Sequence, residues 1–157
     1  MKRLPNRLLT FLSLTFQACT CLAFVIFLYT EIFIKTNIPK CNPNVNLLGF
    51  ALNKCYMRFN PNVDLNPLFD VNTKQVFLYA TMITGSQHEM CWSKIVQRED
   101  PKRFFETVNN NYPFGIVEGK ENIAEVFFEL RASILPRVGR TKDILLAHFS
   151  HKLQNNE

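Results

Sequence analysis

A chain of 157 residues has room for about one domain, and 15 phenylalanines with only 5 glycines and 20% charged residues are unusual for a soluble one. The net charge of +5 is uneven, because Lys2, Arg3 and Arg7 precede the first acidic residue, and the other 15 basic residues face all 13 acidic ones. The surplus of +2 beyond the first 30 residues excludes the basic stripe of a nucleic-acid-binding protein. We therefore expect no nucleic-acid partner.

Residues 8–30 contain no Asp, Glu, Lys, Arg or His, and leucine and phenylalanine dominate them. As a helix, these 23 residues would be about 35 Å long, enough to cross a hydrocarbon core of about 30 Å. A cleavable signal peptide has an apolar stretch of only about 7–15 residues. Cys21-x-Ala23 could serve as its cleavage site, but the mature protein would then begin with the apolar run 24–29. We expect an uncleaved transmembrane signal-anchor helix over 8–30.

The basic residues on either side of this span predict its orientation. Three lie in the tail 1–7, whereas only Lys35 and Lys40 follow closely, which favours a cytosolic N-terminus. The tail also suits contact with anionic headgroups of the lipid bilayer. A short tail before a long C-terminal part is typical of a single-pass type II membrane protein. The expected segments are cytosolic tail 1–7, transmembrane helix 8–30, linker 31–49, β domain 50–150 and C-terminal tail 151–157.

One face of the predicted span carries four polar side chains within an arc of about 80°. They are Thr10, Ser13, Gln17 and Thr20. An amide in hydrocarbon costs free energy unless it is hydrogen-bonded, and polar seams are where membrane helices meet. The alternative is that serine and threonine hydroxyls bond back to their own helix. Because of Gln17, we predict that this seam meets a partner helix.

Beyond the span, short apolar runs alternate with turns. Residues 36–49 hold two prolines and several asparagines, and indicate a linker or a loose first edge. Strands are expected at 55–59, 75–83 and 91–98. The run 75–83 is apolar at both alternate sets of positions, which predicts a central strand covered on both faces.

The C-terminal half begins with an expected helix. Asp100 can cap it and Pro101 suits its first position, so one short helix is predicted from there towards the asparagine run 109–111. Residues 122–132 fit both an alternating strand and a helical face, and their Val, Ile and Phe content favours a strand. A turn at 136–139 and a last apolar segment follow. The fold class predicted is mainly β: a small sandwich-like domain with one short helix, after the N-terminal helix.

Five cysteines are too few and too unevenly placed for a disulfide scaffold. Cys19 and Cys21 lie inside the predicted span, which leaves Cys41, Cys55 and Cys91. Three is an odd number, so at most one internal disulfide can form and at least one thiol stays free. Whether Cys41 and Cys55 are bridged stays open at this level.

Two patterns invite chemistry. Ser86 and His88 are two residues apart, but no Gly-x-Ser-x-Gly elbow accompanies them, so a polar turn is the better interpretation. His88-x-x-Cys91 and His148-x-x-His151 offer four zinc-type ligands, yet typical zinc spacings place the pairs closer together. The sequence also has no Asp-x-Asp and no phosphate-binding glycine loop. We expect no catalytic residue, no metal and no cofactor.

Several short motifs follow one another as they do in the signal peptidase complex subunit 3 family. The run 68–79 (Leu-Phe-Asp-Val-Asn-Thr-Lys-Gln-Val-Phe-Leu-Tyr) resembles the family's Phe-Asp-Trp-Asn, Lys-Gln and apolar run with a tyrosine. Residues 92–96 (Trp-Ser-Lys-Ile-Val) are similar to its Trp-Asp-Lys-Ile-Val. Asp-Pro-Lys at 100–102 and Leu-Pro at 135–136 follow in order. The likeness covers about residues 66–139.

The resemblance implies a cytosolic N-terminus, an endoplasmic reticulum membrane location and a lumenal β-sandwich over 50–150. It also implies a non-catalytic accessory subunit of the signal peptidase complex. Its partners would be the serine-type catalytic subunit and the other subunits, which together remove signal peptides from preproteins. An anchored domain can hold reacting groups in near-attack geometry without reacting itself, so we expect it to position the catalytic subunit.

The family motif also suggests where partners would bind. The motif residues expected to contact a partner are Phe69, Asp70, Asn72, Lys74, Gln75, Tyr79 and Trp92. Core packing is the alternative for Phe77 and Tyr79. Two departures from the family stand out: Val71 replaces a tryptophan, and Asn-Ile-Ala at 122–124 replaces an Asn-x-Thr sequon, so glycosylation is not expected there.

Two other functions compete with the subunit role. The first is a free-standing lumenal binding module on the same type II anchor. The second is a small membrane-anchored hydrolase that would use Ser86 and His88.

Overall fold

The computed structural model describes residues 3–33, 37–51, 54–84, 87–114 and 125–152, which form a helical unit and a larger β unit. In the helical unit, α1 (Arg3–Phe33) extends the predicted span at both ends. Its window from Asn6 to Ile32 has a mean hydropathy of 2.1 and no buried residues. An apolar helix of this length that buries none of its side chains in its own fold is suited to a bilayer. This agrees with the predicted membrane anchor.

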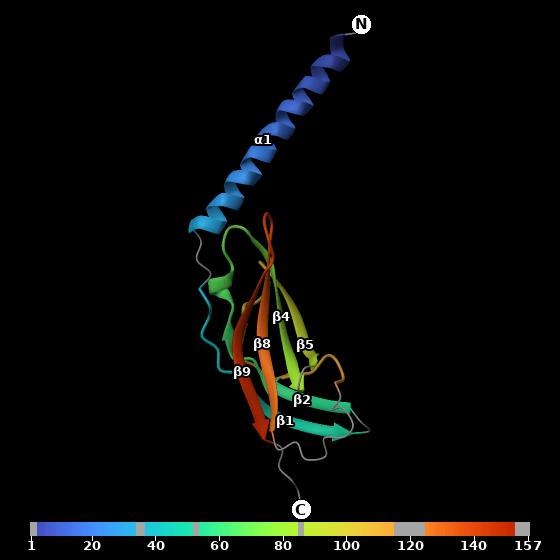
Figure 1. Cartoon of the computed structure of the whole chain (residues 1–157), viewed down its shortest axis with the longest axis vertical. Coiled ribbons are helices and arrows are strands. Elements are labelled where there is room, and N and C mark those ends of the chain that lie inside the picture. Colours follow the sequence, from blue (N-terminus) through green and yellow to red (C-terminus); the bar gives the residue numbers. More distant parts are fainter. Residues whose placement is uncertain (1–2, 34–36, 52–53, 85–86, 115–124, 153–157) are drawn as a thin grey trace, which may run out of the picture. The chain divides into compact units, whose positions relative to one another are not determined.

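Within the described residues, the β unit consists of three antiparallel sheets (Figure 1). The three-stranded sheet has the order β1 (Asn44–Ala51), β2 (Lys54–Asn60), β7 (Val108–Asn109). The four-stranded sheet has the order β5 (Gln87–Gln97), β4 (Thr73–Thr84), β8 (Glu125–Pro136), β9 (Lys142–Lys152). The two-stranded sheet pairs β3 (Val63–Asp64) with β6 (Arg103–Phe104), and a single 3-10 turn, η1 (Asn66–Leu68), precedes β4.

The predicted strands at 55–59, 75–83 and 91–98 are confirmed as β2, β4 and β5. The ambiguous segment 122–132 is a strand from Glu125 onwards, and its first three residues lie outside the described part. The turn before β9 is also confirmed, with Gly139 at a φ of 115° that only glycine adopts readily. The mainly β fold is therefore confirmed.

The helix expected after Asp100 is wrong. The Asp100 carboxylate instead accepts the backbone N–H of Gln97 at 2.8 Å, so it closes a tight turn at the end of β5. The chain then extends as β6, whose Phe104 pairs with Val63 of β3. Local capping signals lose here because pairing with β3 and packing against the core reward an extended backbone. In addition, β1 begins at Asn44, inside the segment interpreted as a linker or loose edge.

The β4 strand is central, as predicted, because it pairs with both β5 and β8. Its side chains at 76, 78, 80 and 82 are fully buried between the sheets. Its other face is only half-buried at Phe77, Tyr79 and Ile83. Thr81 on the same face is buried, so the prediction that both faces are covered holds only in part. We call this partly exposed face of the four-stranded sheet its open face.

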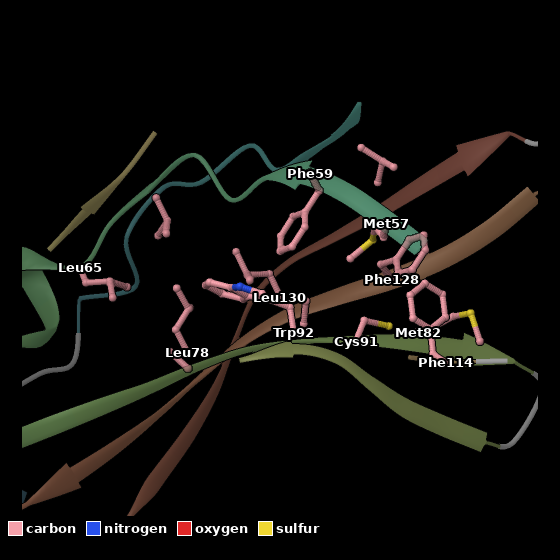
Figure 2. Packing of buried hydrophobic residues seen from close by; sticks show 14 of the residues in the cluster. Met57, Phe59, Leu65, Leu78, Met82, Cys91, Trp92, Phe114, Phe128 and Leu130 are labelled. Carbon is pink, nitrogen blue, oxygen red and sulfur yellow. The ribbon is translucent and has the colours of Figure 1, made fainter. Parts of the chain in front are cut away.

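Aromatic side chains join the two larger sheets (Figure 2). Phe59 of β2 meets Trp92 of β5 edge to face, with ring centroids 5.5 Å apart. Phe59 also stacks on Phe149 of β9 at 6.0 Å, and Phe149 stacks on Phe128 of β8 at 5.3 Å. Such contacts stabilise by about 0.5–1.5 kcal/mol beyond the area they bury. They make the β unit a sandwich with a continuous core.

Replacing Phe59 by alanine tests this core. We expect Phe59→Ala to lower the free energy of unfolding by about 3–5 kcal/mol, because it leaves a cavity between the two sheets. Urea unfolding of the full chain in detergent micelles, followed by the fluorescence of the single Trp92, measures the loss. The matched control is Phe105→Ala: Phe105 is 52% exposed, so its loss is expected to stay below about 1 kcal/mol. Equal losses would contradict the assignment of Phe59 to the core.

Candidate functional site

The polar seam of α1 divides into two kinds of residue. Thr10 and Thr20 donate their hydroxyls to the carbonyl oxygens four residues earlier, at 2.8 and 2.9 Å, so their polar groups are satisfied within the helix. In the described part of the chain, the side chains of Ser13 and Gln17 make no hydrogen bond. These two residues are four apart and share one face of the helix. Of the four seam residues, Ser13 and Gln17 therefore remain as candidates for hydrogen bonding to a partner helix.

The first part of the family motif builds a tight turn into β4. The Asp70 carboxylate accepts the backbone N–H groups of Asn72 and Thr73, at 2.8 and 2.7 Å. The guanidinium of Arg98 donates to the carbonyl oxygens of Asp70 and Thr73, which ties this turn to the end of β5. Val71 stands at the tip and is 85% exposed. Asp70 thus shapes the turn that presents residue 71.

The other motif residues lie in different surroundings. Phe69 is half-buried under Lys102, whose Nζ lies 5.0 Å from the ring centroid, and Asn72 is buried. Lys74 is exposed and Gln75 half-exposed at the start of β4. Trp92 is buried in the core, so its role in the fold is packing. The motif is therefore not one continuous surface, since it contributes to a turn, a sheet face and the core.

Tyr79 points away from the core into a polar network on the open face of the four-stranded sheet. Its hydroxyl donates to the Asp143 carboxylate at 2.9 Å, and the Arg131 guanidinium donates to the same carboxylate at 2.6 Å. Arg131 also contacts Glu129 at 3.2 Å, and His148 lies 3.5 Å from the other oxygen of Glu129. These contacts fix Tyr79 and Arg131 in position.

The protonation equilibria reflect this order. Partial burial, followed by the hydrogen bond to Asp143, raises the pKa of the Tyr79 phenol above its ordinary value. The hydrogen bond to Asp143 raises the pKa of the Arg131 guanidinium despite some burial. Tyr79 is therefore a neutral hydrogen-bond donor and Arg131 a fixed cation. The sequence pointed to Tyr79 only; the alternation of Glu129 and Arg131 with apolar neighbours could have placed them on this face as well.

Apolar side chains surround the network. Phe77 stacks on Tyr79 at 5.3 Å, and Ile95, which pairs with Phe77, is 51% exposed. Phe127 of β8 is 53% exposed and, with Ile83, lines an open hollow of about 530 Å³. We call these residues and the network (Phe77, Tyr79, Ile83, Ile95, Phe127, Glu129, Arg131, Asp143 and His148) the outer face. It combines one exposed and two half-buried aromatic side chains with a preformed ion pair.

The residue patterns that could support chemistry do not converge in the described parts of the chain. No three His, Cys, Asp or Glu residues there gather as a metal ion would require. His88 is exposed on β5, and Ser86 lies outside the described residues. Burial raises the pKa values of the Cys55 and Cys91 thiols to about 12, so both stay protonated near neutral pH. The expected lack of a catalytic or metal site stays a prediction.

The Asp70 turn gives a direct test of the motif's structural role. We expect Asp70→Ala to lower the free energy of unfolding by about 1–2 kcal/mol, because two backbone N–H groups of a half-buried turn lose their acceptor. Val71→Ala is the matched control at the next position and should change it by less than about 0.5 kcal/mol. Urea unfolding of both variants measures the difference. If Asp70→Ala left the free energy of unfolding unchanged, the turn would not depend on this carboxylate.

Comparison with known proteins agrees with this fold and these motifs. The sequence model described as "Signal peptidase subunit" matches residues 1–155. Over 98 residues the chain is 32% identical to signal peptidase complex subunit 3 of Saccharomyces cerevisiae. The aligned region covers 58% of this chain. The matched part spans about half (53%) of the length of that relative. The ordered motifs and the match over nearly the whole sequence together show that the chain belongs to the signal peptidase subunit family.

Proposed function

We propose that this chain is a non-catalytic accessory subunit of the endoplasmic reticulum signal peptidase complex, and that it supports signal-peptide removal by positioning the catalytic subunit. The family match over residues 1–155 is the observation that carries the proposal. The architecture supports it: an apolar helix long enough to span a bilayer is followed by a sandwich with a continuous core. Peptide-bond cleavage requires catalytic groups held in near-attack geometry, and a rigid anchored domain supplies that restraint.

The orientation completes the proposal. The basic tail 1–7 would face the cytosol and the β unit the lumen, in a single-pass type II arrangement. Basic residues Lys2, Arg3 and Arg7 outnumber Lys35 and Lys40 around the span, which supports this direction. In this arrangement the domain stands on the side of the membrane where signal peptides are removed.

The outer face is the surface we propose for the catalytic subunit. Aromatic residues and arginine are enriched at the centres of protein interfaces, and the half-buried Tyr79, the exposed Phe127 and the partly exposed Arg131 supply them here. The Asp143 carboxylate already holds Tyr79 and Arg131 in one conformation, so binding would cost less side-chain entropy. Val71 and Lys74 lie outside this surface, so the motif would contribute to it mainly through Tyr79.

The decisive experiment is a purification of the tagged full chain from its own membranes. A signal peptidase catalytic chain should co-purify in near-equal amount, and depletion of this protein should make uncleaved preproteins accumulate. Recovery of the chain without a catalytic partner would favour a free-standing binding module instead. A chain that cleaves preproteins by itself, and loses that activity on replacement of Ser86 and His88, would favour the hydrolase.

Gln17 provides a sharper test of the proposed membrane contact. We expect Gln17→Leu to reduce co-purification of the other subunits about 5-fold, which corresponds to one interhelical hydrogen bond of about 1 kcal/mol. Thr20→Val is the matched control, because the Thr20 hydroxyl already bonds to its own helix and its loss should leave recovery unchanged. Quantitative mass spectrometry of the purified complexes compares the two. If both substitutions reduced recovery equally, or if neither reduced it, the proposal that the seam contacts a partner helix would be wrong.

A further inference from the structure

The two larger sheets of the β unit each contribute one buried cysteine to the core between them. Cys55 lies on β2 of the three-stranded sheet and Cys91 on β5 of the four-stranded sheet, and both are fully buried. Both belong to the cluster of buried hydrophobic residues that joins the sheets. The accessory-subunit function proposed above gives neither thiol a role.

A β-bulge turns Cys91 towards the core. On β4, Ala80 pairs with Trp92 while the next residue, Thr81, pairs with Met90, so Cys91 is the extra residue on β5. Successive strand residues normally point to opposite faces, but a bulge re-aims one of them. Cys91 and Trp92 are therefore both buried, and Figure 2 shows them pointing into the same core as Met57 of β2. Trp92 itself touches Phe59 of β2, so the bulge faces that strand.

The segment 110–114 holds the two cysteines at the same level of the sandwich. The backbone N–H of Cys55 donates to the carbonyl of Phe114 at 2.7 Å. The N–H groups of Asn111 and Tyr112 both donate to the carbonyl of Cys91 at 3.1 Å. One short segment is thus bonded to both cysteine backbones. Burial is the main cause of the raised pKa of the Cys91 thiol. The Cys55 thiol raises this pKa further by electrostatic interaction, which is consistent with a short distance between the two thiols.

Cys41 is not placed for the same pairing. It forms an isolated bridge with Val63, beyond the far end of β2 from Cys55. From Cys55 to Asn60 alone, a strand covers about 16 Å at about 3.3 Å per residue. A disulfide requires Cα atoms less than about 7 Å apart. A Cys41–Cys55 bridge, which the sequence left open, therefore does not fit this fold, and all five thiols are free in the structure.

We propose that Cys55 and Cys91 form an inter-sheet disulfide while the domain folds in an oxidising compartment. The oxidant is a small-molecule or protein disulfide such as glutathione disulfide. One cysteine loses its proton and attacks a sulfur of that disulfide, releasing one glutathione and leaving a mixed disulfide. The other cysteine loses its proton and displaces the second glutathione. Two protein thiols and one glutathione disulfide thus give one protein disulfide and two molecules of glutathione.

The physical setting decides when this exchange takes place. Only the thiolate attacks, and a thiol with a pKa of about 12 is ionised in roughly one molecule in 100,000 at pH 7. Exchange is therefore slow once the sheets have closed and fast in the unfolded chain. The bond then encloses the 35 residues between Cys55 and Cys91 and restricts the unfolded chain. The supply of oxidant depends on the lumenal position proposed above, whereas the pairing depends only on this fold.

Peptide mapping of the full chain tests the pairing. The chain is refolded in detergent micelles with glutathione and glutathione disulfide, blocked with iodoacetamide and digested with trypsin without reduction. Trypsin places Cys41, Cys55 and Cys91 in separate peptides, 41–54, 55–58 and 75–94. We expect peptides 55–58 and 75–94 to be linked, and the link to disappear on reduction. Both peptides alkylated, or either one linked to 41–54, would overturn the proposal.

Matched variants complete the test. Cys41→Ala should keep the link, whereas Cys55→Ala should leave peptide 75–94 fully alkylated. Reduction should lower the thermal midpoint of the wild-type chain and of Cys41→Ala by about 5 °C or more. It should not change the midpoint of the double variant Cys55→Ala, Cys91→Ala, and equal shifts in all three would refute the bond. Neither measurement includes another subunit, so a missing catalytic partner in the pull-down would sink the proposed function and leave this result standing.

Discussion

The edge-to-face contact between Phe59 and Trp92 is the constraint on which the β unit depends. It links β2, the central strand of the three-stranded sheet, to β5, an edge strand of the four-stranded sheet, and Phe149 extends it to β9. Buried aromatic side chains remove about 150–250 Å² each from water, at about 25 cal/mol per Å². Because strand side chains alternate, fixing these residues inwards also fixes which residues point outwards. Tyr79 and Arg131 are outward for that reason, so the core determines the outer face.

How much the sequence predicts depends on the range of the interaction. The runs at 55–59, 75–83 and 91–98 were predicted correctly because their apolar content reports burial directly. The helix at Asp100 was predicted from local capping signals, and a pairing between Phe104 and Val63, 41 positions apart, overrides them. The apolar side chains of β4 predict its buried face. No local sequence feature, however, predicts that its other face stays partly exposed.

The same distinction applies to the candidate sites. The spacing of Ser13 and Gln17 is a property of one helix, so the sequence suffices to place them on one face. The partners of Tyr79 come from β8 and β9, and only the strand register brings Arg131 and Asp143 to it. The family motif marks Asp70 and Trp92 without saying that one shapes a turn and the other fills the core. Motif residues thus identify the protein family, but they do not show which of them contact a partner.

The positioning role proposed above would require stiffness more than reactive groups, and long paired strands provide stiffness in this fold. The ladder between β4 and β8 runs from Thr73 to Ile83, and β5 and β9 extend it on both sides. A bulge weakens such a ladder locally, because one residue is left unpaired. At Cys91 that residue is the one directed at the opposite sheet, and a covalent bond to Cys55 would restore locally the restraint that the bulge removes. The bulge at Cys91 is one of three register shifts in the described part of the four-stranded sheet, and a link to the opposite sheet at this point would add rigidity where the β4–β5 pairing is interrupted.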